Sequence, residues 1–215
     1  MGLLSKNNSP GESHQTELIE RVALFGRLQL LHARLLVTRS ATRTLEDWCR
    51  ENNLTDDPTV TVIQQFGTTK PPTAQTLANL QAAPSEIAYR YVSLCSDGQV
   101  LATADNWFVP SRLSGYMNAQ LKTTTPFGKV IAPLRPFRIV LNTRDLWSVL
   151  PEGWHRLTLD ELGEWARSQP APLYRPTTKL FSQETLLIQE KGTPLSIVHE
   201  YFAMSLLAAQ FKQFR

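Results

Sequence analysis

The chain has 215 residues, of which 42% are hydrophobic and 19% charged, a composition typical of a globular protein with one sizeable core. The formal net charge is only +3 and the basic residues are scattered, which argues against a general nucleic-acid or membrane partner. An anionic small molecule is the partner that fits such a chain better.

The N-terminal segment and the cysteines bear on location and on covalent cross-links. Residues 1–13 are rich in Ser, Asn and Gly and lack hydrophobic periodicity, so we expect a disordered leader there. The start has no secretory signal peptide, and no run of about eighteen apolar residues occurs, so we expect a cytoplasmic protein without an integral membrane segment. Cys49 and Cys95 belong to no CxxC pair and have no histidine nearby, which predicts neither a disulfide framework nor a metal site.

Two helices are expected after the leader. Between residues 16 and 36 apolar side chains recur at helical spacing, which predicts an amphipathic helix with a break near Gly26. A second helix follows, because Thr38 and Ser40 are suitable N-caps and the next apolar residues share one face.

The middle and the end of the chain are rich in strand signals. Residues 59–66 are β-branched and alternating, and a long connection over 67–86 follows. The strand-like runs 87–95 and 99–110 flank an Asp-Gly turn, a strong signal for a β-hairpin. Further strands are predicted at residues 137–141, 178–190 and 194–202.

The order of these elements predicts the fold class. Strands outnumber helices and do not alternate with them, which indicates an α+β fold with a mostly antiparallel sheet and flanking helices. We expect residues 14–215 to form a single domain, with an insertion at about 148–172 that carries a helix. A further helix is expected at the C-terminus.

Two charged residues lie on apolar strand faces. Side chains alternate along a strand, so Arg90 shares its face with Val92, and Glu200 lies between Val198 and Phe202. A buried arginine needs a carboxylate partner, from the protein or from a ligand. For Glu200 the sequence leaves open whether burial raises its pKa or a nearby arginine lowers it.

A purely structural explanation of these charges is also available. A symmetric hairpin places Asp105 opposite Arg90, so the two could form a cross-strand ion pair, or Arg90 could pair with Glu200. His199 lies on the face away from Glu200, so we assign it no catalytic role. The chain has no GxSxG, P-loop, GxGxxG or HExxH motif, so hydrolysis, nucleotide binding and metal catalysis lack their usual signatures.

Five segments between residues 31 and 202 resemble, in order, the chorismate pyruvate-lyase family of quinone biosynthesis. They are TRSATRTLE, TVTVIQQ, AYRYVSLCSDGQVLATADNWFVPSRLSG, TTPFGKVI and TPLSIVHEYF. The resemblance implies a chorismate lyase-like fold and a monomeric, cofactor-free carbon-oxygen lyase. Such an enzyme converts chorismate to 4-hydroxybenzoate and pyruvate, as a step toward ubiquinone or plastoquinone.

The resemblance also implies a set of site residues. The family's substrate-binding arginine corresponds to Arg90 and its glutamate to Glu200, and both are expected to act in substrate binding and catalysis. Arg90 would clamp a carboxylate, while Glu200 would bind the ring hydroxyl and assist proton movement. Phe127 stands where the family more often has leucine, and Ala41 where methionine is familiar. These two residues and the backbone amides near Gly128 are expected to shape the substrate pocket.

Three alternatives stay open. The ligand-binding domains of some bacterial transcription regulators resemble this fold, so a non-catalytic sensor of a small aromatic carboxylate is one; only a short polar segment and one helix precede the matched region. The departures at Ala41 and Phe127 allow a lyase for a related enolpyruvyl compound. An interaction protein could use Arg135, Arg138 and Arg144, although scattered arginines usually lie on a solvated face.

Overall fold

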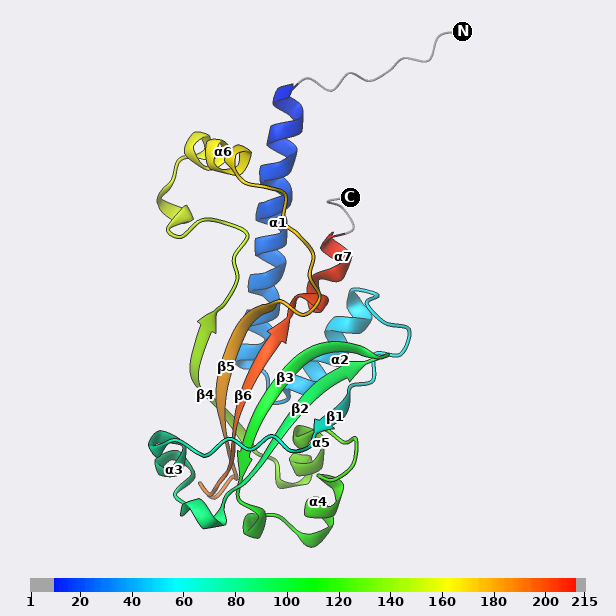
Figure 1. The fold of residues 1–215 in the computed structure, drawn as a ribbon, viewed down its shortest axis with the longest axis vertical. Coiled ribbons are helices and arrows are strands. Elements are labelled where there is room, and N and C mark those ends of the chain that lie inside the picture. The colour runs from blue at the N-terminus through cyan, green and yellow to red at the C-terminus, as the bar shows by residue number, and fades with distance from the viewer. Residues whose placement is uncertain (1–9, 212–215) are drawn as a thin grey trace.

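The computed structural model describes residues 10–211, and a curved six-stranded sheet is its central element (Figure 1). The strand order is β1-β2-β3-β6-β5-β4, and every neighbouring pair is antiparallel. The strands are β1 (Thr61–Gln65), β2 (Ala88–Ser96), β3 (Gln99–Phe108), β4 (Phe137–Asp145), β5 (Lys179–Ile188) and β6 (Pro194–Ala203). This architecture confirms the predicted α+β fold with an antiparallel sheet.

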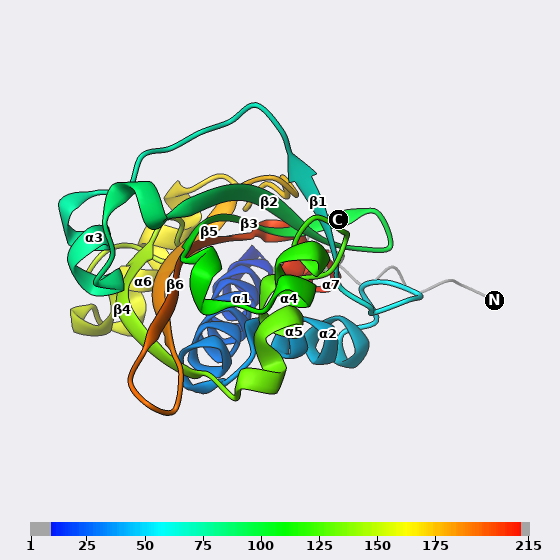
Figure 2. The same cartoon turned by 90° about the horizontal axis from the view of Figure 1, so that it is seen from below.

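Helices cover both faces of the sheet. The α-helices are α1 (Pro10–Val37), α2 (Ala41–Glu51), α3 (Ala74–Leu80), α4 (Gly115–Gln120), α5 (Phe127–Ile131), α6 (Leu159–Ser168) and α7 (Ala208–Phe211). Short 3-10 turns lie at Pro84–Glu86, Pro110–Arg112, Ala132–Leu134, Trp154–Arg156 and Met204–Leu207. Figure 2 shows α1, α2 and α5 on one face, here called the inner face, while the connection from β1 to α3 crosses the outer face.

Helix α1 corrects two predictions. It runs without interruption through Gly26, so the predicted break is wrong. A row of leucines from Leu24 to Leu35 is buried against the core, and this packing outweighs the cost of about 1 kcal/mol for a glycine inside a helix. Residues 10–13, expected in the leader, are helical, and residues 1–9 of the predicted leader lie outside the described residues.

The predicted helix within the 148–172 insertion is α6, which packs against α1. The Arg21 guanidinium donates to the carbonyl of Pro170 at 2.7 Å and lies over the Trp165 ring. The Phe25 and Trp154 rings meet edge to face at 5.1 Å. These contacts fix the segment 148–172 to α1. No helix within residues 10–211 is long and apolar enough to span a membrane.

The β2–β3 hairpin is confirmed, but its register differs from the symmetric one. Near the turn Cys95 pairs with Val100, as expected, and then Leu94 pairs with Ala102, so Leu101 is an extra residue in β3. Such a β-bulge moves every later residue of the strand to the opposite face. Arg90 therefore pairs with Asn106, and Asp105 lies on the outer face.

Candidate ligand-binding site

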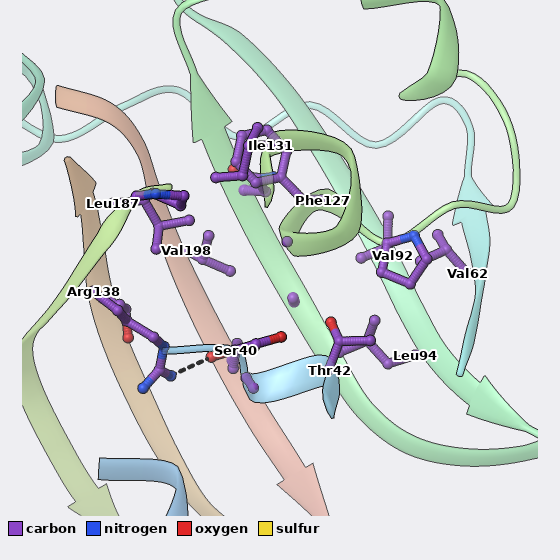
Figure 3. A pocket seen from close by; sticks show the side chains of 18 of the residues that line it. Ser40, Thr42, Val62, Val92, Leu94, Phe127, Ile131, Arg138, Leu187 and Val198 are labelled. Atoms are coloured by element: carbon purple, nitrogen blue, oxygen red, sulfur yellow. Dashed lines mark hydrogen bonds and ion pairs between the residues drawn. The ribbon is translucent and has the colours of Figure 1, made fainter. Parts of the chain in front are cut away.

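A cavity lies between the inner face of the sheet and the first turns of α2 and α5 (Figure 3). Its empty volume is about 680 Å³ when the open mouth is included. All five residues singled out by the sequence line it, namely Ala41, Arg90, Phe127, Gly128 and Glu200. Chain segments far apart in the sequence thus meet around one space.

Two cross-strand rows form the floor of this cavity. In the first row Arg90, Asn106, Val198 and Thr185 lie side by side on four strands. In the second row, one pleat further on, Val92, Ala104, Glu200 and Gln183 follow in the same order. Strand β3 separates Arg90 from Glu200, so their backbones are roughly 10 Å apart across the sheet. The small side chains between the two charges leave the space that a ligand can fill.

Arg90 is a buried cation without a partner in the part of the chain that the structure describes. The residue is only 4% exposed, and none of its three guanidinium nitrogens has a hydrogen-bond partner among the described residues. Burial lowers the pKa of Arg90 to about 10, which still leaves the side chain charged at neutral pH. Because an uncompensated buried charge is costly, this guanidinium gives the cavity a strong preference for an anion.

Glu200, by contrast, already has a cation. Arg138 Nη2 donates to Glu200 Oε2 at 2.9 Å, and the two side chains are only 4% and 8% exposed. Arg138 also donates to Gln183 Oε1 at 3.2 Å and to the Leu35 carbonyl at the end of α1. The carboxylate is thereby held in one orientation, and its second oxygen is available as an acceptor.

Arg138 is a central site residue that the sequence analysis does not identify. The sequence places it among scattered arginines typical of a solvated face, yet it lines the cavity from β4, as Figure 3 shows. On this edge strand the apolar residues Phe137, Ile139 and Leu141 are exposed. Their hydrophobicity would therefore predict that this face, and not the face of Arg138, is buried. The sequence did hold one signal for Arg138. If Arg90 binds a ligand, a buried Glu200 needs another cation as its partner.

The first turn of α2 closes the cavity on the side opposite the sheet. Ser40 is its N-cap and accepts from the Arg43 backbone at 3.3 Å, while Ala41 and Thr42 are buried in the helix that follows. The free backbone N–H groups at a helix start favour negative charge. The N-terminus of α2 therefore favours an anion in the cavity, as Arg90 does.

Phe127 forms the wall above the sheet at the start of α5. Its ring lies 5.7 Å from that of Phe108, in a tilted arrangement, and belongs to a second apolar cluster that includes Ile131. Gly128 follows it close to the Thr42 side chain, which brings the two helix starts together. This wall gives the ligand an apolar surface against which a ring can lie.

Asp105 does not compete for Arg90, so the ion pair between them that the sequence left open as an alternative is wrong. On the outer face its carboxylate accepts from Lys70 Nζ at 2.9 Å and from the Tyr89 hydroxyl at 2.6 Å. His199 lies on the same outer face, stacked on Tyr201. Within the part of the chain that the structure describes, no group of three or more His, Cys, Asp or Glu side chains could hold a metal ion.

Comparisons with solved structures give only distant similarities. PhnF from Mycobacterium smegmatis is 10% identical with a TM-score of 0.48, over 78% of this chain and 65% of PhnF. Its effector domain is 9% identical with a TM-score of 0.46, over 76% of this chain and 88% of the domain. The possible transcriptional regulator YydK from Bacillus subtilis is 18% identical with a TM-score of 0.40, over 66% of this chain and 58% of YydK. The chain thus spans less than two thirds of PhnF and YydK, and similarity at this level assigns no function.

Similarity in sequence is closer. No family model matches the chain. The chain is 38% identical over 192 residues to the uncharacterized protein y4mC from Sinorhizobium fredii (strain NBRC 101917 / NGR234), which covers 88% of this chain and 78% of that protein. The chain therefore belongs to the family of the Sinorhizobium fredii protein y4mC.

Proposed function

We propose that the cavity binds a small ring carboxylate, with Arg90 as the counter-ion of the carboxylate. The observation that carries this proposal is the buried guanidinium with no hydrogen-bond partner among residues 10–211. A carboxylate can accept two parallel hydrogen bonds from it, which compensates the charge and orients the ligand. The apolar wall around Phe127 favours a flat or nearly flat ring as the body of that ligand.

The specific reaction we propose is that of a chorismate pyruvate-lyase. Arg90 holds the ring carboxylate, and Glu200, fixed by Arg138, accepts a hydrogen bond from the ring hydroxyl. The bond between the ring and the enolpyruvyl oxygen breaks, and the ring carbon that bears the hydroxyl loses its proton. The electrons of that C–H bond complete the aromatic ring, and a proton on the departing methylene carbon gives pyruvate. Orientation and preorganised charge are what the protein supplies.

Purified protein incubated with chorismate tests this reaction. Ultraviolet spectra should show 4-hydroxybenzoate, and a coupled lactate dehydrogenase assay should show an equal amount of pyruvate. R90A should abolish turnover, and R90K should lose most of it, because an ammonium group keeps the charge but not the planar fork.

The variant R90M is the matched control for folding. It fills a similar volume and removes a charge that has no partner within residues 10–211, so its melting temperature should not fall below that of the wild type. An unchanged rate of pyruvate release in R90A would overturn the role of Arg90, and a wild type that releases no pyruvate would overturn the reaction.

One observation favours a second candidate, a sensor that binds the same kind of ligand without turnover. Glu200 is already engaged by Arg138 at 2.9 Å, and a binding domain needs an oriented acceptor rather than a free base. Calorimetry with 4-hydroxybenzoate separates the two candidates. Binding that R90A abolishes, together with stable chorismate, would support the sensor and exclude the lyase.

A further inference from the structure

Thr185 on β5 presents a polar group to the cavity that neither Arg90 nor Glu200 accounts for. The residue lines the cavity, is 1% exposed, and its hydroxyl has no hydrogen-bond partner in the described part of the chain. Asn106, another polar residue of the cavity wall, does have a hydrogen-bond partner, because the Ser196 hydroxyl donates to its side-chain oxygen. A buried hydroxyl without a partner is destabilising, so a ligand atom that hydrogen-bonds it would remove that penalty.

The sheet register places Thr185 beside Glu200. Thr185 pairs with Val198 and Glu200 pairs with Gln183, so Thr185 and Glu200 are diagonal neighbours on the inner face. Diagonal neighbours of this kind lie about 7–8 Å apart, and their side chains converge on one region of the cavity. Arg90 lies in the same row as Thr185 but on β2, two strands away from Val198. If Arg90 binds the carboxylate of a ring compound, the opposite end of the ring therefore lies near both Thr185 and Glu200.

We propose that Thr185 determines specificity by hydrogen-bonding a second ring oxygen, next to the oxygen bound by Glu200. The site then prefers ring carboxylates with two adjacent oxygen substituents over those with one. This inference rests on the proposed function, because it takes the carboxylate to be bound by Arg90. It adds a contact that distinguishes ligands which share that carboxylate.

Calorimetric titration with 4-hydroxybenzoate and 3,4-dihydroxybenzoate tests the inference. The wild type should bind the dihydroxy compound about 3- to 10-fold more tightly, the effect of one net hydrogen bond. In T185V, which keeps the shape and removes the hydroxyl, the ratio of the two dissociation constants should fall to about one. T185S retains a hydroxyl and should retain the preference.

Thr103 provides the matched control. Its hydroxyl is also buried without a partner among the described residues, but it lies on β3 between Ala102 and Ala104, which are on the inner face, so it points to the outer face. T103V removes the same atom away from the cavity and should leave the ratio as in the wild type. Thermal melting of all variants checks folding, and neither valine substitution removes a side-chain hydrogen bond to another described residue.

The outcomes separate this inference from the proposed function. Equal affinities for the two compounds in the wild type, or a preference that survives in T185V, would overturn the role of Thr185. In that case R90A-sensitive binding of 4-hydroxybenzoate would still support the proposed function. Failure of the wild type to bind either compound would overturn the proposed function and the inference with it.

Discussion

Two arginines on the inner face of the sheet have opposite roles. Arg90 has no partner among the described residues, whereas Arg138 joins Glu200, Gln183 and the end of α1 in one network. With one carboxylate for two guanidinium groups, the buried site has a net charge of +1. A ligand with a single carboxylate at the Arg90 end neutralises it, while Glu200 stays an oriented acceptor.

The Arg138–Glu200 pair yields a prediction about stability. R138Q should lower the free energy of unfolding by about 3–5 kcal/mol, because it leaves the Glu200 carboxylate buried without its cation. Urea denaturation measures the loss. In the double variant R138Q/E200Q the loss should be smaller than the sum of the two single losses, because no buried carboxylate remains. Additive losses would show that the two side chains do not interact.

At the scale of elements, strand alternation predicted much of the site and failed at two places. It placed Arg90 and Glu200 on an inner face, and both line the cavity. The bulge at Leu101 escaped prediction because nothing in the local sequence requires it; the pairing of β3 with β6 on its other side depends on the whole sheet. Arg138 escaped because β4 is an edge strand with apolar residues on its exposed face.

The uninterrupted helix α1 allows a prediction with a clear sign. Gly26 lies inside the helix, and a Cβ atom there would meet nothing within 4 Å. G26A should therefore raise the free energy of unfolding by about 0.5–1 kcal/mol, since alanine loses less backbone entropy on folding. Gly98 is the contrasting control, because its φ of +75° strains any side chain and G98A should destabilise the hairpin. A destabilised G26A would argue for a break in α1.

At the scale of the whole molecule, positive charge gathers beside the mouth of the cavity. A cleft shares Arg39, Ser40 and Gly128 with the cavity and adds Arg43, Arg135 and Glu190 to its walls, together with the ion pairs Lys129–Glu46 and Arg50–Asp47. Arg39, Arg43 and Arg135 are exposed and have no ion pair within residues 10–211. Such a group of cations attracts an anionic ligand toward the entrance before it reaches Arg90.

This charge predicts association kinetics that depend on salt. The double variant R43E/R135E should bind 4-hydroxybenzoate with an association rate about tenfold lower at low ionic strength, with little change in the dissociation rate. Stopped-flow measurements over a series of salt concentrations test this, and the difference should fade as salt is added. R156E, a charge reversal in the insertion on α1, is the control and should leave the association rate unchanged. If R43E/R135E instead changes the dissociation rate by the same factor at every salt concentration, electrostatic attraction toward the entrance is contradicted.

The extra residue in β3 has a consequence for how such a site can arise. With the symmetric register, Arg90 would face Asp105, and the hairpin would neutralise its own charge. With Leu101 inserted, Asp105 pairs with Lys70 on the outer face and Arg90 keeps an unused positive charge inside. One added residue is therefore enough to turn a hairpin that neutralises its own charge into one whose arginine has no partner among the described residues. In this chain the placement of Arg90 and Asp105 on opposite faces depends as much on strand length as on the choice of side chains.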